Sequence, residues 1–120
     1  MQKKTIVIGA SANPERYSYK AVSRLAAHNI EVVPLGAKKG MIEGIPIQNT
    51  PDDFKDIHTV SMYLNPDRQK AYYDYILSLH PKRIIFNPGA ENPELRNIAE
   101  KNGIEAVEVC TLVMLSTDQF

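Results

Sequence analysis

Short apolar runs alternate along the chain with longer segments whose apolar residues recur at helical spacing. The first run, Thr5 to Ile8, is β-branched and apolar on both faces, which is typical of a strand buried in a parallel sheet. Further strands are predicted at residues 31–35, 59–64, 83–86 and 105–109. The segments between them include helices predicted at residues 18–29, 65–79 and 92–103. The alternation predicts a parallel sheet with helices on both faces.

Capping residues mark the predicted helix ends. Asn65-Pro66 and Asn92-Pro93 each predict a helix start, and Thr50-Pro51 predicts a further short helix. Gly103 suits the left-handed position that follows a helix. The tail, residues 110–120, is expected to form one more helical turn.

The first two strands and the helix between them span about thirty residues, the length of a βαβ unit. We predict an α/β fold, a Rossmann-like three-layer sandwich with a five-stranded parallel sheet in the order 3-2-1-4-5, counted along the chain. At 120 residues, the chain is expected to form a single domain over 1–120. Ligands of such sheets bind outside the carboxyl ends of the strands, where the strand order reverses.

Composition narrows the function classes. The formal net charge is zero, which argues against broad binding to nucleic acid. No apolar run approaches the roughly 20 residues of a membrane helix, and residues 1–4 lead into a strand without the apolar stretch of a signal peptide. One cysteine excludes an internal disulfide and suits a reducing compartment. The expected location is the cytoplasm.

The turn after the first strand is the best candidate for a ligand site. Gly9 ends the strand where the backbone turns tightly or approaches a ligand. Ser11, Ser18 and free main-chain N–H groups at a helix start would bind phosphate oxygens. A tight turn without a ligand uses the same residues, so both interpretations stand.

The residues around this turn narrow the kind of nucleotide. Ser11 and Pro14 stand where a dinucleotide fingerprint has its second and third glycines. The end of the second strand carries no carboxylate for an NAD ribose, but Lys38 and Lys39 follow it. A lysine pair there favours a ligand with an extra phosphate, coenzyme A (CoA) or NADP, unless both lysines are simply solvated.

Three motifs together resemble a known family. They are Val7-Ile8-Gly9-Ala10-Ser11-x-Asn13-Pro14-x-Arg16-x-Ser18-Tyr19, Glu43-Gly44-Ile45-Pro46 and Asn87-Pro88-Gly89-Ala90-Glu91-Asn92. They are similar to motifs of the CoA-binding domain family, small stand-alone Rossmann-like proteins that resemble the N-terminal domain of the succinyl-CoA synthetase alpha subunit. The resemblance covers nearly the whole chain. The chain departs from it at Leu35-Gly36-Ala37, where the family usually has Val-Asn-Pro, and at Phe86-Asn87, where many members have Trp and Gln.

The resemblance implies how the ligand is held. The turn after the first strand, from Gly9 to Asn13, would hold the CoA phosphates, and we call it the glycine loop. The loop after the second strand, which carries Lys38 and Lys39, would meet the nucleotide end of CoA, and we call it the lysine loop. The loops after the third and fourth strands would flank the adenine and the pantetheine arm. The implied cofactor-binding residues are Gly9, Ala10, Ser11, Asn13, Arg16, Ser18, Lys38, Tyr63, Asn65, Pro66, Asn87, Pro88, Gly89 and Ala90.

Candidate catalytic groups are few. His28, His58 and His80 are scattered, and no spacing of His, Cys and Asp predicts a metal site. The related ligase reacts through a phosphohistidine carried on another domain. Cys110, at the end of the fifth strand, is either a small buried hydrophobe or a thiol close to the CoA thiol.

We therefore expect a protein that binds CoA or an acyl-CoA without catalysis of its own. The alternatives are an NADP-binding oxidoreductase or sensor and a ligand-free interaction module. The protein partners that fit this expectation are further copies of the chain in a homo-oligomer, or a ligase-like protein. Three tyrosines are predicted to lie in the core or at an oligomer contact: Tyr72, Tyr73 and Tyr75.

Overall fold

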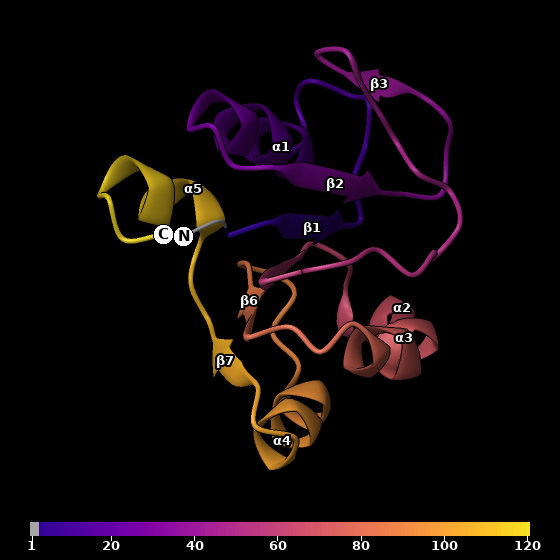
Figure 1. Ribbon diagram of the computed structural model, residues 1–120, viewed down its shortest axis with the longest axis vertical. Coiled ribbons are helices and arrows are strands. Elements are labelled where there is room, and N and C mark those ends of the chain that lie inside the picture. Colours follow the sequence, from indigo (N-terminus) through magenta and orange to yellow (C-terminus); the bar gives the residue numbers. More distant parts are fainter. Residues whose placement is uncertain (1–2) are drawn as a thin grey trace.

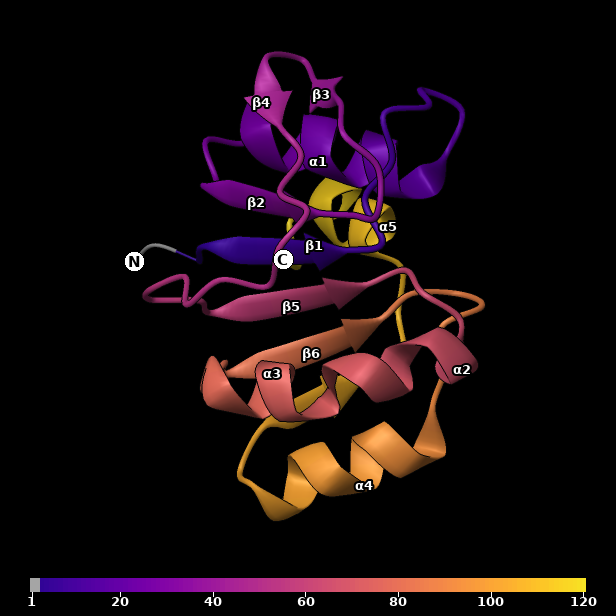
Figure 2. The same cartoon turned by 90° about the vertical axis from the view of Figure 1, so that its right-hand side faces the viewer.

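The structure is a computed structural model that describes residues 3–120, so the first two residues of the predicted domain lie outside the described residues. A five-stranded parallel sheet forms its centre (Figure 1), built from β1 (Thr5–Ile8), β2 (Val32–Leu35), β5 (Thr59–Met62), β6 (Arg83–Phe86) and β7 (Glu105–Val107). The helices are α1 (Tyr17–Ala27), α2 (Pro66–Gln69), α3 (Tyr73–Ser78), α4 (Pro93–Lys101) and α5 (Thr111–Ser116). α1 and α5 cover one face of the sheet, and α3 and α4 cover the other (Figure 2). The predicted α/β, Rossmann-like sandwich is confirmed.

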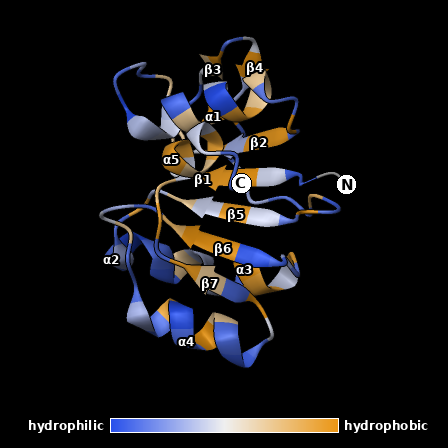
Figure 3. Cartoon of the chain, turned by 90° about the vertical axis from the view of Figure 1, so that its left-hand side faces the viewer, coloured by the Kyte–Doolittle hydropathy of each residue, from blue (hydrophilic) through white to orange (hydrophobic). Residues whose placement is uncertain are grey.

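β1 lies inside the sheet and is buried on both faces, as predicted. Ile6 and Ile8 pack into the apolar cluster beneath α3 and α4, while Val7 packs into the cluster beneath α1 and α5. β5 is also buried on both faces, but Thr59 and Ser61 make it more polar, and it is correspondingly paler than β1 in Figure 3. One face of the sheet therefore includes buried hydroxyl groups.

The strand order differs from the predicted 3-2-1-4-5, and this part of the prediction is wrong. The third strand along the chain, β5, pairs with β1 instead of lying outside β2, and the order is β2-β1-β5-β6-β7. Pro34 explains why β2 stays at the edge. Its carbonyl faces away from β1 and accepts the Gln48 N–H at 2.8 Å. Its nitrogen faces the same way and has no hydrogen to offer a further strand.

The observed order moves the point at which a ligand is expected. The strand order now reverses between β1 and β5, so the loops after these two strands flank the crevice. These loops are in contact. The Tyr63 N–H donates to the Ile8 carbonyl at 2.9 Å, and a Cβ at Gly9 would lie 3.2 Å from Leu64.

The predicted short helix at Thr50-Pro51 is absent. In a helix the Asp52 carbonyl would accept the N–H four residues later. Here it accepts the Phe54 N–H at 2.9 Å and the Tyr75 hydroxyl at 2.7 Å. The segment before β5 is therefore held to α3 by a tertiary contact that local pattern does not reveal.

A two-stranded hairpin that the sequence analysis did not predict lies between β2 and β5, with β3 (Met41–Ile42) paired to β4 (Ile45–Pro46). Its turn places Glu43 at φ 49° and Gly44 at φ 85°, the two positive values of a tight hairpin turn. Ile42 is buried in the same apolar cluster as α1. The hairpin thus extends the core beyond the edge strand β2.

The remaining helices largely follow the prediction. α1 and α4 match it closely, whereas the helix expected over 65–79 is divided by a 3₁₀ turn, η1 (Lys70–Tyr72), between α2 and α3. α5 is the helical turn expected after the last strand. Beyond α5 the chain returns to the amino end of the sheet. There the main-chain oxygen of Phe120 accepts hydrogen bonds from Lys3 at 2.6 Å and Arg83 at 2.9 Å. Within residues 3–120, no helix is long and apolar enough to cross a bilayer.

Candidate functional site

The first loop is bonded closely to the end of β2. Gly9 has φ +97°, a left-handed conformation that favours glycine. The N–H groups of Gly9 and Ala10 both donate to the Leu35 carbonyl, at 2.9 and 3.0 Å. They are therefore not free phosphate donors. The N–H groups of Ser11 and Ala12 have no hydrogen-bond partner within residues 3–120, so they are the donors that this loop leaves for a ligand.

Asn13 shapes the turn that leads into α1. Its carboxamide oxygen accepts the Glu15 N–H at 3.0 Å, and its carbonyl accepts the Arg16 N–H at 3.0 Å. The Ser11 hydroxyl accepts the Asn13 N–H at 3.1 Å. Ser11 and Asn13 thus brace the loop, while Arg16 is exposed and Ser18 is buried at the helix start.

The start of α1 has no side-chain cap, unlike the starts of α2 and α4. Asn65 caps α2 and Asn92 caps α4, and each of these helices has an acidic residue in its first turn. α1 begins after Arg16, whose side chain makes no capping hydrogen bond, and its first turn holds no acidic residue. Helix starts carry partial positive charge and unpaired N–H groups. The N-terminus of α1 is therefore left able to bind an anion.

Two glycines bring the loop after β2 against the first loop. A Cβ at Gly36 would lie 2.2 Å from the Ala10 carbonyl oxygen, and one at Gly40 would lie 2.8 Å from the Ala12 Cβ. The first of these distances is too short for any side chain on this backbone. Lys38, between the two glycines, is exposed, as is its neighbour Lys39. The structure therefore places the lysine loop beside the glycine loop, and the close approach at Gly36 requires glycine on this backbone.

The loop after β5 divides its predicted residues between two roles. The Asn65 side chain caps α2 by accepting the Arg68 N–H at 3.0 Å, and Pro66 occupies the first helical turn. This is the capping role that such Asn-Pro pairs commonly serve. Tyr63 instead lies at the reversal of strand order, with its ring packed against the apolar cluster beneath α1 and α5.

Asn87 follows β6, but its side chain points into the protein. It is fully buried, and its amide donates to the Ser61 hydroxyl at 3.0 Å and the Met62 carbonyl at 2.9 Å. Its carboxamide oxygen accepts the Thr111 N–H at 2.8 Å. The side chain thus links β5, β6 and the start of α5 and is not available to a ligand.

The rest of the loop after β6 is divided between surface and core. Pro88 and Gly89 are exposed, with Gly89 at φ +93°, whereas Ala90 is only 1 % exposed. The Gly89 N–H donates to the Glu91 carboxylate at 2.9 Å. Pro88 and Gly89 are therefore the predicted residues of this loop that a ligand can reach.

Gln69 is a buried polar residue that the sequence analysis did not single out. Its amide donates to the Leu64 carbonyl at 2.8 Å and the Ala90 carbonyl at 2.7 Å, and its oxygen accepts a hydrogen bond from Asn92 at 2.9 Å. It ties the loop after β5 to the loop after β6. Its position, two helical turns before the buried Ile76, places a polar residue on an apolar helix face, which is the signal that could have found it.

The candidate catalytic groups lie apart from one another. His28 Nδ1 lies 2.8 Å from the Arg24 carbonyl, and His58 Nδ1 lies 2.7 Å from the Thr59 hydroxyl, both near the amino end of the sheet. Burial and, next, the Arg83 charge hold the pKa of His58 below its ordinary value. Cys110 is half-buried at the carboxyl end. The part of the chain described, residues 3–120, contains no group of three His, Cys, Asp or Glu residues placed to hold a metal.

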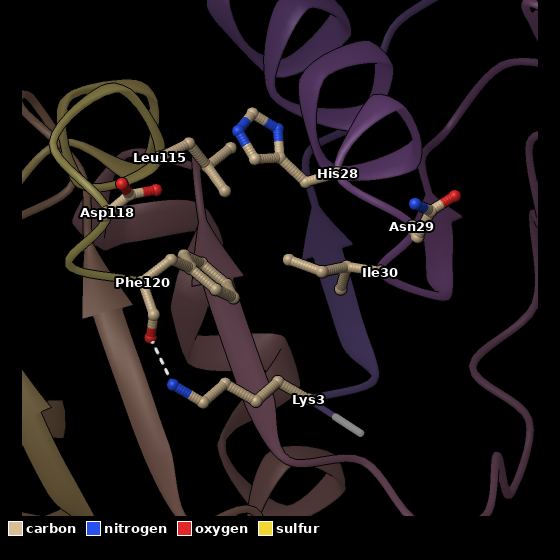
Figure 4. A pocket seen from close by; sticks show the side chains of 7 residues that line it. All are labelled: Lys3, His28, Asn29, Ile30, Leu115, Asp118 and Phe120. Carbon is tan, nitrogen blue, oxygen red and sulfur yellow. Dashed lines mark hydrogen bonds between the residues drawn. The ribbon is translucent and has the colours of Figure 1, made fainter. Parts of the chain in front are cut away.

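A pocket of about 330 Å³ lies at the opposite, amino edge of the sheet (Figure 4). It is lined by Lys3, His28, Asn29, Ile30, Leu115, Asp118 and Phe120. These residues come from the end of α1, the end of α5 and the start of β1. None of them was predicted to contact a ligand, so this pocket is separate from the predicted site.

Comparison with known proteins decides the family. A family model described as a CoA binding domain matches residues 3–116. The chain belongs to the CoA binding domain family. The resemblance found in the opening motif is thereby confirmed, and CoA is the ligand that membership of this family suggests.

Solved structures share the fold of this family member. One crystal structure, of an uncharacterized protein, shares 49 % sequence identity with this chain and has a TM-score of 0.96. The match covers 100 % of this chain and 99 % of the other chain. A hypothetical protein from Pyrococcus horikoshii OT3 is 23 % identical, with a TM-score of 0.87 and coverage of 97 % and 83 %. A conserved hypothetical protein from Pyrococcus furiosus is 26 % identical, with a TM-score of 0.80 and coverage of 92 % and 97 %. No curated protein matches the sequence.

Proposed function

We propose that this protein binds CoA or an acyl-CoA where the loops after β1, β2 and β5 meet, without catalysis of its own. The observation that carries the proposal is the start of α1, whose first turn has neither a side-chain cap nor an acidic residue. It follows the N–H groups of Ser11 and Ala12, which have no hydrogen-bond partner within residues 3–120. A pyrophosphate supplies the negative charge and the acceptor oxygens that these donors lack.

Lys38 is the residue proposed for the outer phosphate of CoA. It is exposed, and the close approach of Gly36 to Ala10 holds its loop beside the glycine loop. A lysine ammonium binds phosphate as a point charge, so a flexible exposed side chain suffices. Any chemistry on the bound thioester would come from a partner or another domain, as the resemblance to the ligase subunit implies.

Isothermal titration calorimetry at low salt tests the proposal. Wild type is expected to bind CoA, and Lys38→Glu is expected to weaken CoA binding about tenfold or more, because a charge-assisted contact is replaced by repulsion. Dephospho-CoA, which lacks the outer phosphate, is expected to bind wild type and Lys38→Glu alike. Lys101→Glu, an exposed substitution at the end of α4, is the matched control. No heat with CoA, or equal CoA affinity in Lys38→Glu, would contradict the proposal.

NADP is the second candidate, because the lysine loop also suits a phosphate on the nucleotide ribose. A thermal-shift panel with CoA, acetyl-CoA, NADP, NADPH and NAD separates the two. Stabilisation by NADPH and not by CoA would favour the NADP-linked alternative. Stabilisation by none of these ligands would favour an interaction module.

A further inference from the structure

One side-chain hydrogen bond fastens the hairpin formed by β3 and β4 to α1, which lies beside it (Figure 2). The Ser23 hydroxyl, in the middle of α1, donates to the Glu43 carboxylate at 2.6 Å. Within residues 3–120, it is the side-chain hydrogen bond that joins these two elements. Glu43 opens the motif Glu43-Gly44-Ile45-Pro46, to which the proposed function gives no role.

Both partners of this bond stand where another residue type would be locally more favourable. Glu43 has φ 49°, in the left-handed region, and precedes Gly44 in the tight hairpin turn. Asparagine and glycine adopt this conformation more readily than glutamate does. Ser23 lies inside α1, where alanine is the better helix former. Two locally unfavourable residues that bond to each other indicate a role in the tertiary structure.

The hairpin and the lysine loop are parts of one closed unit. At one end of the lysine loop, the Gly36 N–H donates to the Gln48 carbonyl at 2.9 Å. At the other end, the Gly40 carbonyl accepts the Ile47 N–H at 2.9 Å, and the chain then enters β3. Both bonds join the lysine loop to the segment that follows β4. We call this unit, residues 36–48, the lysine lobe.

The lysine lobe is attached to the rest of the protein at its base and at its tip. At the base, the Gln48 N–H donates to the Pro34 carbonyl of β2 at 2.8 Å. At the tip, Ile42 packs in the apolar cluster beneath α1, and burial of this kind is not directional. A hydrogen bond depends on both distance and angle. The bond between Ser23 and Glu43 therefore sets how the tip lies against α1.

We propose that Glu43, held by Ser23, is a positioning residue that sets the distance between Lys38 and the start of α1. The inference rests on the proposed function, in which the start of α1 binds the pyrophosphate of CoA and Lys38 binds its outer phosphate. The first of these groups belongs to α1 and the second to the lysine lobe. The bond between α1 and the lobe therefore matters to CoA, which spans both groups, and not to dephospho-CoA, which lacks the outer phosphate.

Ser23→Ala tests this role by calorimetry without a change of charge. Its affinity for CoA is expected to fall about threefold to fivefold, the loss of one exposed hydrogen bond to a carboxylate. Its affinity for dephospho-CoA is expected to equal that of wild type. Urea unfolding checks that the variant stays folded, and its midpoint is expected to stay close to that of wild type, because the better helix former offsets the lost bond. A bond that served stability alone would leave the ratio of the two affinities unchanged.

Glu43→Gln and Glu43→Asn form a matched pair, because both remove the charge but only glutamine keeps the length that reaches Ser23. The ratio of CoA affinity to dephospho-CoA affinity is expected to be about threefold to fivefold lower in Glu43→Asn than in Glu43→Gln. The urea midpoint of Glu43→Asn is nevertheless expected to be the higher of the two, since Asn-Gly is a favoured hairpin turn. Equal ratios in these two variants, or a wild-type ratio in Ser23→Ala, would overturn the inference.

A double variant shows whether the effect passes through Lys38. In the Lys38→Glu protein, a further Ser23→Ala change is expected to leave the CoA affinity where it is, because the group to be positioned is already lost. A second, independent loss there would overturn the inference while leaving the proposed function standing. Absence of CoA binding by wild type would overturn the proposed function, and the inference with it.

Discussion

Truncation of Asn87 to alanine separates a structural role from a ligand-binding one. The sequence analysis placed Asn87 among the cofactor-binding residues. The structure buries its side chain completely and uses the amide to join β5, β6 and the start of α5. Asn87→Ala is therefore expected to destabilise the folded protein even when no ligand is present.

The cost can be worked out from what each partner loses. Ser61 keeps its bond to Thr111 at 2.8 Å, and the Met62 carbonyl keeps the Asn87 main-chain N–H at 3.3 Å. Losing these two side-chain bonds costs about 0.5–1 kcal/mol each. The Thr111 N–H is buried with no replacement partner, which costs a further 1–3 kcal/mol or so. The expected loss is about 3 kcal/mol, or roughly 10 °C in melting temperature for a chain of this size.

Urea unfolding followed by circular dichroism measures this loss in the ligand-free protein. Asn65→Ala is the matched control, because Asn65 is exposed and its side chain only caps α2. Its expected cost is about 1 kcal/mol. A loss below about 1 kcal/mol for Asn87→Ala would refute the reasoning, since it would mean that the buried amide contributes little to the docking of α5.

Two further predictions concern backbone approach and pH. Gly36→Ala is expected to lower the urea midpoint more than Gly44→Ala. A Cβ at Gly36 would lie 2.2 Å from the Ala10 oxygen, whereas a Cβ at Gly44 meets no atom and costs only the strain of a positive φ. An equal or smaller effect of Gly36→Ala would contradict the close packing of the two loops. Because the pKa of folded His58 lies below its ordinary 6.5, stability present above that pH is expected to fall as the pH drops through 6.5 toward the folded pKa, and His58→Gln should reduce that fall. NMR titration measures the pKa directly, and a value at or above 6.5 would contradict this prediction.

Local pattern was sufficient for most of the elements. β1 was predicted from four consecutive apolar or β-branched residues, and the structure buries all four. α4 was predicted from its ends, where Asn92 accepts the N–H groups of Glu94 and Leu95 and Gly103 takes φ 75°. These features act over three or four residues, so neighbouring positions in the sequence contain the information. The glycine loop and Lys38 were singled out in the same way, and their role in ligand binding stays a prediction.

Side-chain roles at the site depended on distant neighbours. Asn65 and Asn87 have the same Asn-Pro context, yet Asn65 is exposed and caps α2, whereas the side chain of Asn87 is buried between strands. Asn87 bonds residues 24 to 26 positions away. A sequence pattern shows which residue types follow a strand, but it does not show whether a side chain points out of the edge or into the core.

Strand order separates the two kinds of information most clearly. The alternation of apolar runs established a parallel α/β sheet, because each run needs burial on both faces and each helix needs burial on one. The sequence pattern left open whether β5 lies beside β1 or beyond β2. Pro34 leaves the outer edge of β2 short of one main-chain donor, and an isolated bridge to Gln48 pairs there in place of a full strand. That choice places the reversal of strand order between β1 and β5. It brings Tyr63, the residue that follows β5, to this reversal, where its main-chain N–H donates to the Ile8 carbonyl at 2.9 Å.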